Sequence, residues 1–267
     1  MATDLIGYLL AVLVGVSLGL IGSGGSILTV PILVYVMGVN PILATAYSLF
    51  VVGTTSLVGG VQNAIQKKVD FKTVFIFGIP SIVAVYLTRA YLMPLIPDVL
   101  FSIGDFQFTK PIALMVLFAI VMIFASISMI RPCPHCKDAD AGEIKYNYPM
   151  ILLEGALVGT LTGLVGAGGG FLIIPALVLL AKMPMKLAVG TSLFIIAVKS
   201  LLGFTGDLQG SETIDWTLLS TFTGLSVVGI FIGIFLSKKI EGNKLKFAFG
   251  WFVLVMGIYI LIKELFL

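Results

Sequence analysis

The sequence has 267 residues, of which 59% are hydrophobic and 11% are charged, and its formal net charge is +3. A soluble globular chain carries roughly 25% charged residues, so no water-soluble fold could bury this much apolar surface. The composition therefore excludes a soluble domain and predicts an integral membrane protein. The small net charge gives no reason to expect nucleic acid as a partner.

Long apolar runs, rather than alternating or one-faced patterns, indicate helices that span a membrane. The first run follows Asp4 and no basic residue, so we expect it to stay in the mature protein and not to be cleaved as a secretory signal. We predict ten apolar segments, at 5–21, 26–37, 41–65, 71–88, 110–130, 150–165, 171–181, 184–206, 216–237 and 245–265. The predicted fold is all-α, with a first membrane repeat at 1–130, a cytoplasmic linker at 131–148 and a second repeat at 149–267.

The two halves repeat each other at a constant offset of 144 residues, and the matches include glycine and proline in the same order. The identical pairs are Gly15/Gly159, Gly19/Gly163, Gly22/Gly166, Gly24/Gly168, Gly25/Gly169, Pro31/Pro175, Leu33/Leu177, Ala44/Ala188, Ser48/Ser192, Leu49/Leu193 and Phe50/Phe194. Ordered matches of this kind indicate a duplication. Because each half holds five segments, the second must start from the opposite side of the membrane, which predicts an inverted-topology repeat.

The distribution of basic residues predicts the orientation. With ten alternating segments, one face collects Lys67, Lys68, Lys72, Arg131, Lys137, Lys145, Lys182, Lys186, Lys238, Lys239, Lys244 and Lys246. The other face collects only Arg89, Lys110 and Lys263. The positive-inside rule puts the rich face in the cytoplasm. We therefore expect a multi-pass protein of the cell (plasma or inner) membrane with both termini extracytoplasmic.

Two segments are too short to cross a hydrocarbon core of about 30 Å at 1.5 Å per residue. They are 26–37 and 171–181, and each follows a glycine-rich link. We predict two half-spanning hairpins whose glycine tips face each other near the midplane, because non-helical backbone must be buried in protein at that depth. Exposed amides and positive helix ends would bind an anion there. The candidate substrate-binding residues are Gly22, Ser23, Gly24, Gly25, Ser26, Gly166, Gly168, Gly169 and Gly170. The alternative is that these glycines only allow close helix packing.

Three further residues complete the candidate site. Ser48 and Ser192 follow the hairpins at equivalent positions and could donate to an oxyanion, or could instead bond back to the preceding helical turn. Lys199 lies inside the eighth segment, where a cation is costly and by default functional, and its first-half counterpart is the neutral Thr55. It could contact substrate, pair with Asp207 or extend toward the membrane surface.

Other polar residues are expected to have plainer roles. We interpret Arg89 as an anchor in the membrane interface, and Asn63 and Asp207 as solvated helix ends. Cys133 and Cys136 flank the single histidine in the linker, but the chain offers no fourth ligand for a tetrahedral zinc site. Two chains sharing a metal, a thiol redox pair and incidental cysteines all stay open. We predict no metal and no cofactor for the protein itself.

The doubled motif Gly15-x3-Gly19-x2-Gly22-x-Gly24-Gly25-x5-Pro31 and Gly159-x3-Gly163-x2-Gly166-x-Gly168-Gly169-Gly170-x4-Pro175 resembles the signature of the TauE/SafE sulfite exporter family. The first copy has Ser26 where the second has Gly170. The resemblance implies a secondary transporter for sulfite, thiosulfate or an organosulfonate, driven by an ion gradient. Its expected partners are the small anion and membrane lipid, while a coupling proton or cation and a homodimer stay open. The alternatives are an anion channel and a membrane thiol-redox enzyme that uses Cys133 and Cys136.

Overall fold

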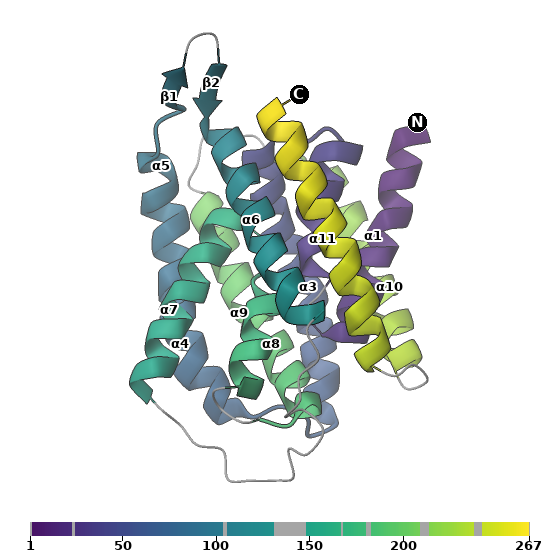
Figure 1. Cartoon of the computed structure of the whole chain (residues 1–267). Coiled ribbons are helices and arrows are strands. Elements are labelled where there is room, and N and C mark those ends of the chain that lie inside the picture. Colours follow the sequence, from purple (N-terminus) through teal and green to yellow (C-terminus); the bar gives the residue numbers. More distant parts are fainter. Residues whose placement is uncertain are drawn as a thin grey trace.

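The computed structural model describes residues 2–22, 25–103, 106–130, 148–166, 168–179, 183–208, 214–237 and 242–266. These residues form a bundle of helices that run roughly along one direction (Figure 1). The elements of the first half are α1 (Ala2–Ile21), α2 (Ser26–Pro31), η1 (Ile32–Val36), α3 (Pro41–Ile65), α4 (Phe71–Leu87), η2 (Thr88–Leu92), α5 (Met93–Leu95), β1 (Val99–Ile103), β2 (Phe106–Thr109) and α6 (Lys110–Ile130). Those of the second half are α7 (Tyr148–Val165), α8 (Gly170–Leu179), α9 (Met185–Asp207), α10 (Trp216–Ser237) and α11 (Gly242–Phe266).

The predicted helical membrane fold is confirmed. Within the described residues, five helices are long and apolar enough to cross a membrane, namely Pro41–Ile65, Phe71–Leu95, Lys110–Ile127, Leu187–Asp207 and Trp216–Ser237. The division into 1–130 and 149–267 stays a prediction, because residues 131–147 of the linker lie outside the described residues.

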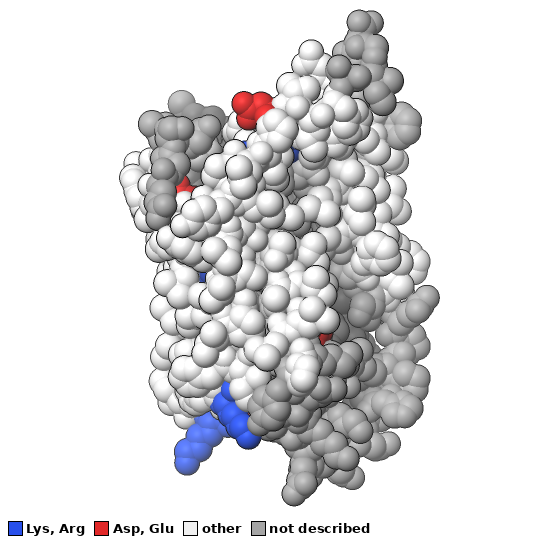
Figure 2. All heavy atoms as spheres, turned by 90° about the vertical axis from the view of Figure 1, so that its left-hand side faces the viewer, with Lys and Arg blue, Asp and Glu red and all other residues white. Residues whose placement is uncertain are grey.

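The two ends of the bundle differ in charge. α1 begins and α11 ends at the same end, which we call the termini end and which is uppermost in Figure 1. α3 ends and α4 begins at the opposite end, where Lys67, Lys68 and Lys72 are exposed, and we call this the lysine end. Figure 2 shows the most prominent basic side chains at the lower end of the face it views and a prominent acidic side chain at the upper end. This difference is the one that the distribution of basic residues predicts for the described part of the chain.

Helices of one half pack mainly on helices of the other. α1 lies along α10, and a Cβ added to Gly15 of α1 would lie 1.9 Å from the backbone oxygen of Ser226. α7 lies along α4 in the same way, and a Cβ on Gly159 would lie 2.5 Å from the backbone oxygen of Ser81. Small residues allow such close contact between helices in membranes. Gly15 and Gly159 therefore allow close packing of helices from the two halves.

The two long central helices, α3 and α9, pack against each other in opposite directions. A Cβ on Gly53 would lie 2.9 Å from Leu201, whereas a Cβ on Gly60, farther along α3, would lie 3.3 Å from Phe194, which comes earlier in α9. These helices occupy equivalent positions in the two halves at the offset of 144 residues. Antiparallel packing of equivalent helices is the geometry that the predicted inverted repeat requires.

The loops that follow α3 and the link before α10 are tied to the opposite half by matching hydrogen bonds. The backbone N–H of Asp70 donates to Thr191 Oγ1 at 2.9 Å, and that of Asp215 donates to the Tyr47 hydroxyl at 2.7 Å. Each aspartate also accepts from the first turn of the next helix, as an N-cap does. Equivalent loops in the two halves are thus held by equivalent contacts.

The structure departs from the predicted elements between the fourth and fifth segments. α4 does not end at residue 88 but continues through the wider turn of η2 and through α5 to Leu95. β1 and β2 then form an antiparallel hairpin in which Phe101 and Phe108 stack with ring centroids 4.7 Å apart. This short hairpin was not predicted from the sequence, and it stands beyond the termini end of the bundle (Figure 1).

The two short segments are helical and fall short of a membrane span. Ser26–Val36 has 11 residues and turns from α-helix into a π-helical stretch after Pro31, which has no N–H to continue the regular pattern. α8 has 10 residues. At 1.5 Å per residue neither exceeds about 17 Å.

Candidate functional site

The two glycine links meet inside the bundle. α2 begins at Ser26 and α8 begins at Gly170. A Cβ added to Gly168 would lie 3.5 Å from Cβ of Ser26 and 2.6 Å from Cγ1 of Val52. The start of the first short helix and the link before the second therefore lie against each other, and both Ser26 and Gly170 are buried. Ser23 and Gly24 lie outside the described residues.

Each glycine link also closes on the long helix of the opposite half. Gly22 has φ of +83°, and an added Cβ would lie 2.3 Å from Cγ1 of Val189. Gly166 has φ of +73°, and an added Cβ would lie 2.4 Å from the backbone oxygen of Thr45. Thr45 and Val189 are equivalent at the offset of 144 residues. The backbone conformation and the close contact both require glycine at these two positions.

The predicted tip glycines differ in conformation. Gly168 and Gly169 have φ of +65° and +62°, the left-handed region that favours glycine. Gly25 has φ of −66°, and it packs against Ser17 and Leu18 of α1. Gly25 therefore needs its small size, while Gly168 and Gly169 need both small size and backbone freedom.

Lys199 lies fully buried beside the second link. Its Nζ donates to Oγ1 of Thr162 at 3.1 Å, and a Cβ on Gly169 would lie 2.9 Å from the same Nζ. In the part of the chain that the structure describes, no carboxylate pairs with Lys199. The alternatives of a pair with Asp207 and of an extended side chain at the membrane surface are thus excluded. Lys199 thus lies inside the bundle with Thr162 as its described hydrogen-bond partner.

The two equivalent serines do not behave alike. Ser192 Oγ donates to the backbone oxygen of Val189 at 2.9 Å, which is the back-bonding alternative. Ser48 Oγ is buried and bonds to no described residue. The two serines therefore differ in this conformation. Ser192 bonds back to its own helix, whereas the hydroxyl of Ser48 has no partner among the described residues.

Sequence reasoning missed three other buried hydroxyls on the central helices. Thr55 and Ser56 of α3 and Ser200 of α9 are fully buried, and their oxygens bond to no described residue. Thr55 is equivalent to Lys199 and Ser56 to Ser200, so the repeat contained the signal that could have found them. Buried polar groups without partners are rare, and their gathering at equivalent positions of α3 and α9 marks a polar stretch within the apolar bundle.

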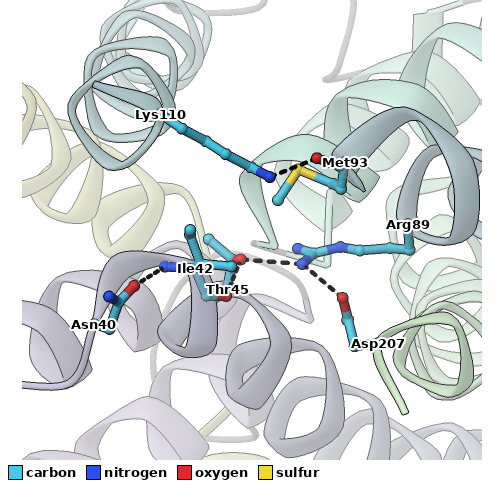
Figure 3. Close-up of polar contacts among 7 residues, drawn as sticks. All are labelled: Asn40, Ile42, Thr45, Arg89, Met93, Lys110 and Asp207. Carbon is cyan, nitrogen blue, oxygen red and sulfur yellow. Dashed lines mark hydrogen bonds and ion pairs between the residues drawn. The ribbon is translucent and has the colours of Figure 1, made fainter. Parts of the chain in front are cut away.

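Arg89 is buried and bonded, which corrects its interpretation as an interface anchor. Its Nη1 donates to Oγ1 of Thr45 at 3.0 Å and to Oδ1 of Asp207 at 3.3 Å (Figure 3). The side chain of Arg89 has no exposed area, and that of Asp207 is 18% exposed. Asp207 is therefore mostly enclosed by the ion pair rather than solvated. The position of Arg89, one residue beyond the predicted segment 71–88, was the feature of the sequence that could have indicated a buried arginine.

The remaining polar residues add little to this site. Nδ2 of Asn63 donates to the backbone oxygen of Gly59 at 2.8 Å, which is a bond back to the preceding turn of α3. The segment with Cys133, His135 and Cys136 lies outside the described residues, so its alternatives stay open.

Membrane-length helices that surround two broken helices define the chain as a polytopic membrane protein of the kind that transporters form. The chain belongs to the TauE/SafE sulfite exporter family, whose model matches residues 7–260. A probable membrane transporter protein of Xylella fastidiosa (strain 9a5c) is 30% identical over 253 residues, which cover 93% of this chain and 91% of the relative.

Relatives from distant organisms carry the same description. The probable membrane transporter protein YunE of Bacillus subtilis (strain 168) is 27% identical, with 96% of this chain and 97% of the relative covered. A probable membrane transporter protein of Methanocaldococcus jannaschii is 28% identical, with 95% of each chain covered. No solved structure gave a significant match. The protein is accordingly a membrane transporter of this family.

Proposed function

We propose that the protein is a secondary transporter that carries a small sulfur-containing anion, namely sulfite, thiosulfate or an organosulfonate, across the cytoplasmic membrane. The anion binds where the two glycine links meet, between Ser26 of the first half and Gly168–Gly170 of the second. The family supports the class of substrate, and the geometry supports the place.

One observation carries this proposal: Lys199 is fully buried beside the α8 link with Thr162 as its described partner and no carboxylate. A cation in this position costs several kcal/mol unless an anion offsets it. Ten-residue α8 starts next to it, so the positive end of the helix dipole adds to the same field. Both features favour negative charge at one point.

The site also suits the shape of an oxyanion. Left-handed glycines at 168 and 169 leave backbone amides uncovered by side chains. The unpaired hydroxyl of Ser48 and the ammonium of Lys199 can add donors from α3 and α9 as those helices move. Several donors around one point match a pyramidal or tetrahedral anion better than a cation or a sugar.

The direct test is flux into proteoliposomes that hold the purified full-length protein. We expect uptake of sulfite, thiosulfate or a sulfonate well above that of protein-free vesicles, and we expect an imposed proton gradient to change its rate. Sulfate is the matched control, because it has the tetrahedral shape and double charge of thiosulfate and differs from it by one oxygen in place of the terminal sulfur. Equal leakage of all four anions would contradict a selective carrier, and single-channel currents across a planar bilayer would favour the channel instead.

We also propose that the lysine end faces the cytoplasm and that both termini are extracytoplasmic. The exposed Lys67, Lys68 and Lys72 support this orientation by the positive-inside rule. The sequence places Cys133 in the connection that the same rule assigns to the cytoplasm. A membrane-impermeant thiol reagent should therefore label Cys133 in inverted vesicles and not in intact cells. Labelling in intact cells would reverse the orientation.

A further inference from the structure

One edge of the Arg89 guanidinium, formed by Nε and Nη2, has no partner among the described residues. This side chain lies toward the termini end of the bundle. Both of its described hydrogen bonds come from Nη1, one to Thr45 and one to Asp207. Nε and Nη2 donate to no described residue, although the side chain is fully buried. The carboxylate of Asp207 is likewise used on one oxygen, since Oδ2 accepts from no described residue.

This pairing is not the one that a purely structural ion pair favours. Arginine binds a carboxylate or another oxyanion most strongly when two parallel N–H groups meet two oxygens. Here Asp207 takes a single contact at 3.3 Å, and two donor nitrogens, Nε and Nη2, are buried without a partner among the described residues. A buried donor without an acceptor lowers the stability of the protein. The guanidinium is thus held in place by Thr45 and Asp207 while its binding edge is free.

Arg89 lies next to the candidate central site. Thr45, which accepts from Arg89, has its backbone oxygen where a Cβ on Gly166 would come within 2.4 Å. Gly166 opens the link that leads to Gly168 and Gly169. Along α9, Asp207 stands eight residues beyond Lys199, which is a rise of about 12 Å. Thr45 alone therefore lies between the guanidinium of Arg89 and the glycine link. About two turns of α9 separate Lys199 from Asp207, the ion-pair partner of Arg89.

The buried charged residues around Arg89 carry a net positive charge. The sequence repeat gives no matching cation at the lysine end. Lys110 is buried and donates from Nζ to the backbone oxygen of Met93, one helical turn beyond Arg89 (Figure 3). The described cluster thus holds two cations and the one carboxylate of Asp207. At the offset of 145 residues that relates the caps Asp70 and Asp215, the counterpart of Arg89 is Ile234. No equivalent cation is expected at the lysine end.

We infer that Arg89 is an anion-binding residue on the path between the termini end and the central site. Its Nε–Nη2 edge takes two oxygens of one oxyanion, while Asp207 and Thr45 stay on Nη1 and hold the guanidinium in place. The inference rests on the proposed function, because it assigns a second position to the same class of substrate. It predicts that Arg89 binds anions with two oxygens on the same atom more tightly than it binds halides.

The test is equilibrium binding of sulfite and thiosulfate, measured by isothermal titration with the full-length protein in detergent, with chloride as the competitor. Arg89→Lys keeps the charge but removes the fork, and we expect it to weaken oxyanion binding about tenfold or more, since each tenfold corresponds to 1.4 kcal/mol. Asp207→Asn removes a nearby negative charge that repels an incoming anion, and it should strengthen oxyanion binding. Lys67→Gln at the lysine end is the matched control and should bind as the unchanged protein does.

The outcomes separate this inference from the proposed function. Sulfite binding that Arg89→Lys leaves unchanged, or that Asp207→Asn weakens, overturns the role of Arg89 and leaves the transporter proposal standing. If the unchanged protein binds acetate or phosphate but no sulfur oxyanion, and Arg89→Lys weakens that binding, the substrate is wrong and the role of Arg89 holds. If either single variant fails to fold, Arg89→Gln combined with Asp207→Asn leaves no lone buried charge. Unchanged oxyanion binding in that double variant also overturns the role of Arg89.

Discussion

Replacing Lys199 by Met is expected to abolish most transport while leaving the protein at least as stable. The methionine side chain has nearly the same length and carries no charge, so the variant removes a buried ammonium that has one described hydroxyl partner, Thr162. Burying such a charge costs stability. A hydrogen bond to a charged group contributes about 1.5–3 kcal/mol, so flux at low substrate concentration should fall about 10- to 150-fold. Proteoliposome flux and thermal unfolding of the same preparation measure both effects.

A matched control for Lys199 is available at the lysine end. Lys67→Met removes the same charge from an exposed position and should change neither flux nor the unfolding temperature. Normal flux in a well-folded Lys199→Met protein would assign the lysine to packing. A large loss of stability would also contradict the argument, since it would mean that the ammonium is well paired in the native state.

The Gly168→Val variant is expected to lose anion binding at the tip. Gly168 has φ of +65°, and an added Cβ would lie 2.6 Å from Cγ1 of Val52. The left-handed conformation costs a residue with a Cβ about 1–2 kcal/mol, and the branched side chain would fill the space between the two tips. We expect sulfite or thiosulfate to raise the unfolding temperature of the unchanged protein and to have no effect on this variant. By the repeat, Gly24→Val should weaken binding as well.

Gly38 provides the control for backbone strain. It has φ of +68° and no atom within 4 Å of an added Cβ, so Gly38→Val carries a similar conformational cost away from the tips. Anion binding should survive in Gly38→Val. Should Gly168→Val not fold, Gly168→Ala together with Val52→Ala relieves the overlap. Full anion binding in that double variant would leave Gly168 as a packing residue.

The bundle could be predicted because its signals are local. Apolar runs fix where helices cross the membrane, and the short lengths of 26–37 and 171–181 mark the helices that do not cross. The offset of 144 residues pairs equivalent elements before any contact is known. These features depend on hydrophobicity, chain length and glycine spacing, which a single sequence displays directly.

The rest depended on which helices become neighbours. Arg89 and Asp207 lie 118 residues apart, and only the packing of α4 against α9 brings them within 3.3 Å. The same holds for Lys199 and Thr162. Ser48 and Ser192 look identical in the sequence, yet only Ser192 bonds back to its own helix. The β1–β2 hairpin was missed because its alternation of apolar and polar side chains is short, spanning only residues 101–103 and 106–109 between two long apolar segments.

The exchange of partners between the halves has a consequence for how the chain matures in the bilayer. α1 of the first half packs through its glycines on α10 of the second half, and α7 of the second half packs on α4 of the first. While only the first half has been synthesised, its broken helix and its glycine faces meet lipid, which cannot satisfy free backbone amides. Assembly must therefore wait until the last helices insert. The predicted inverted repeat implies that a single half would find equivalent contacts in a second copy of opposite orientation.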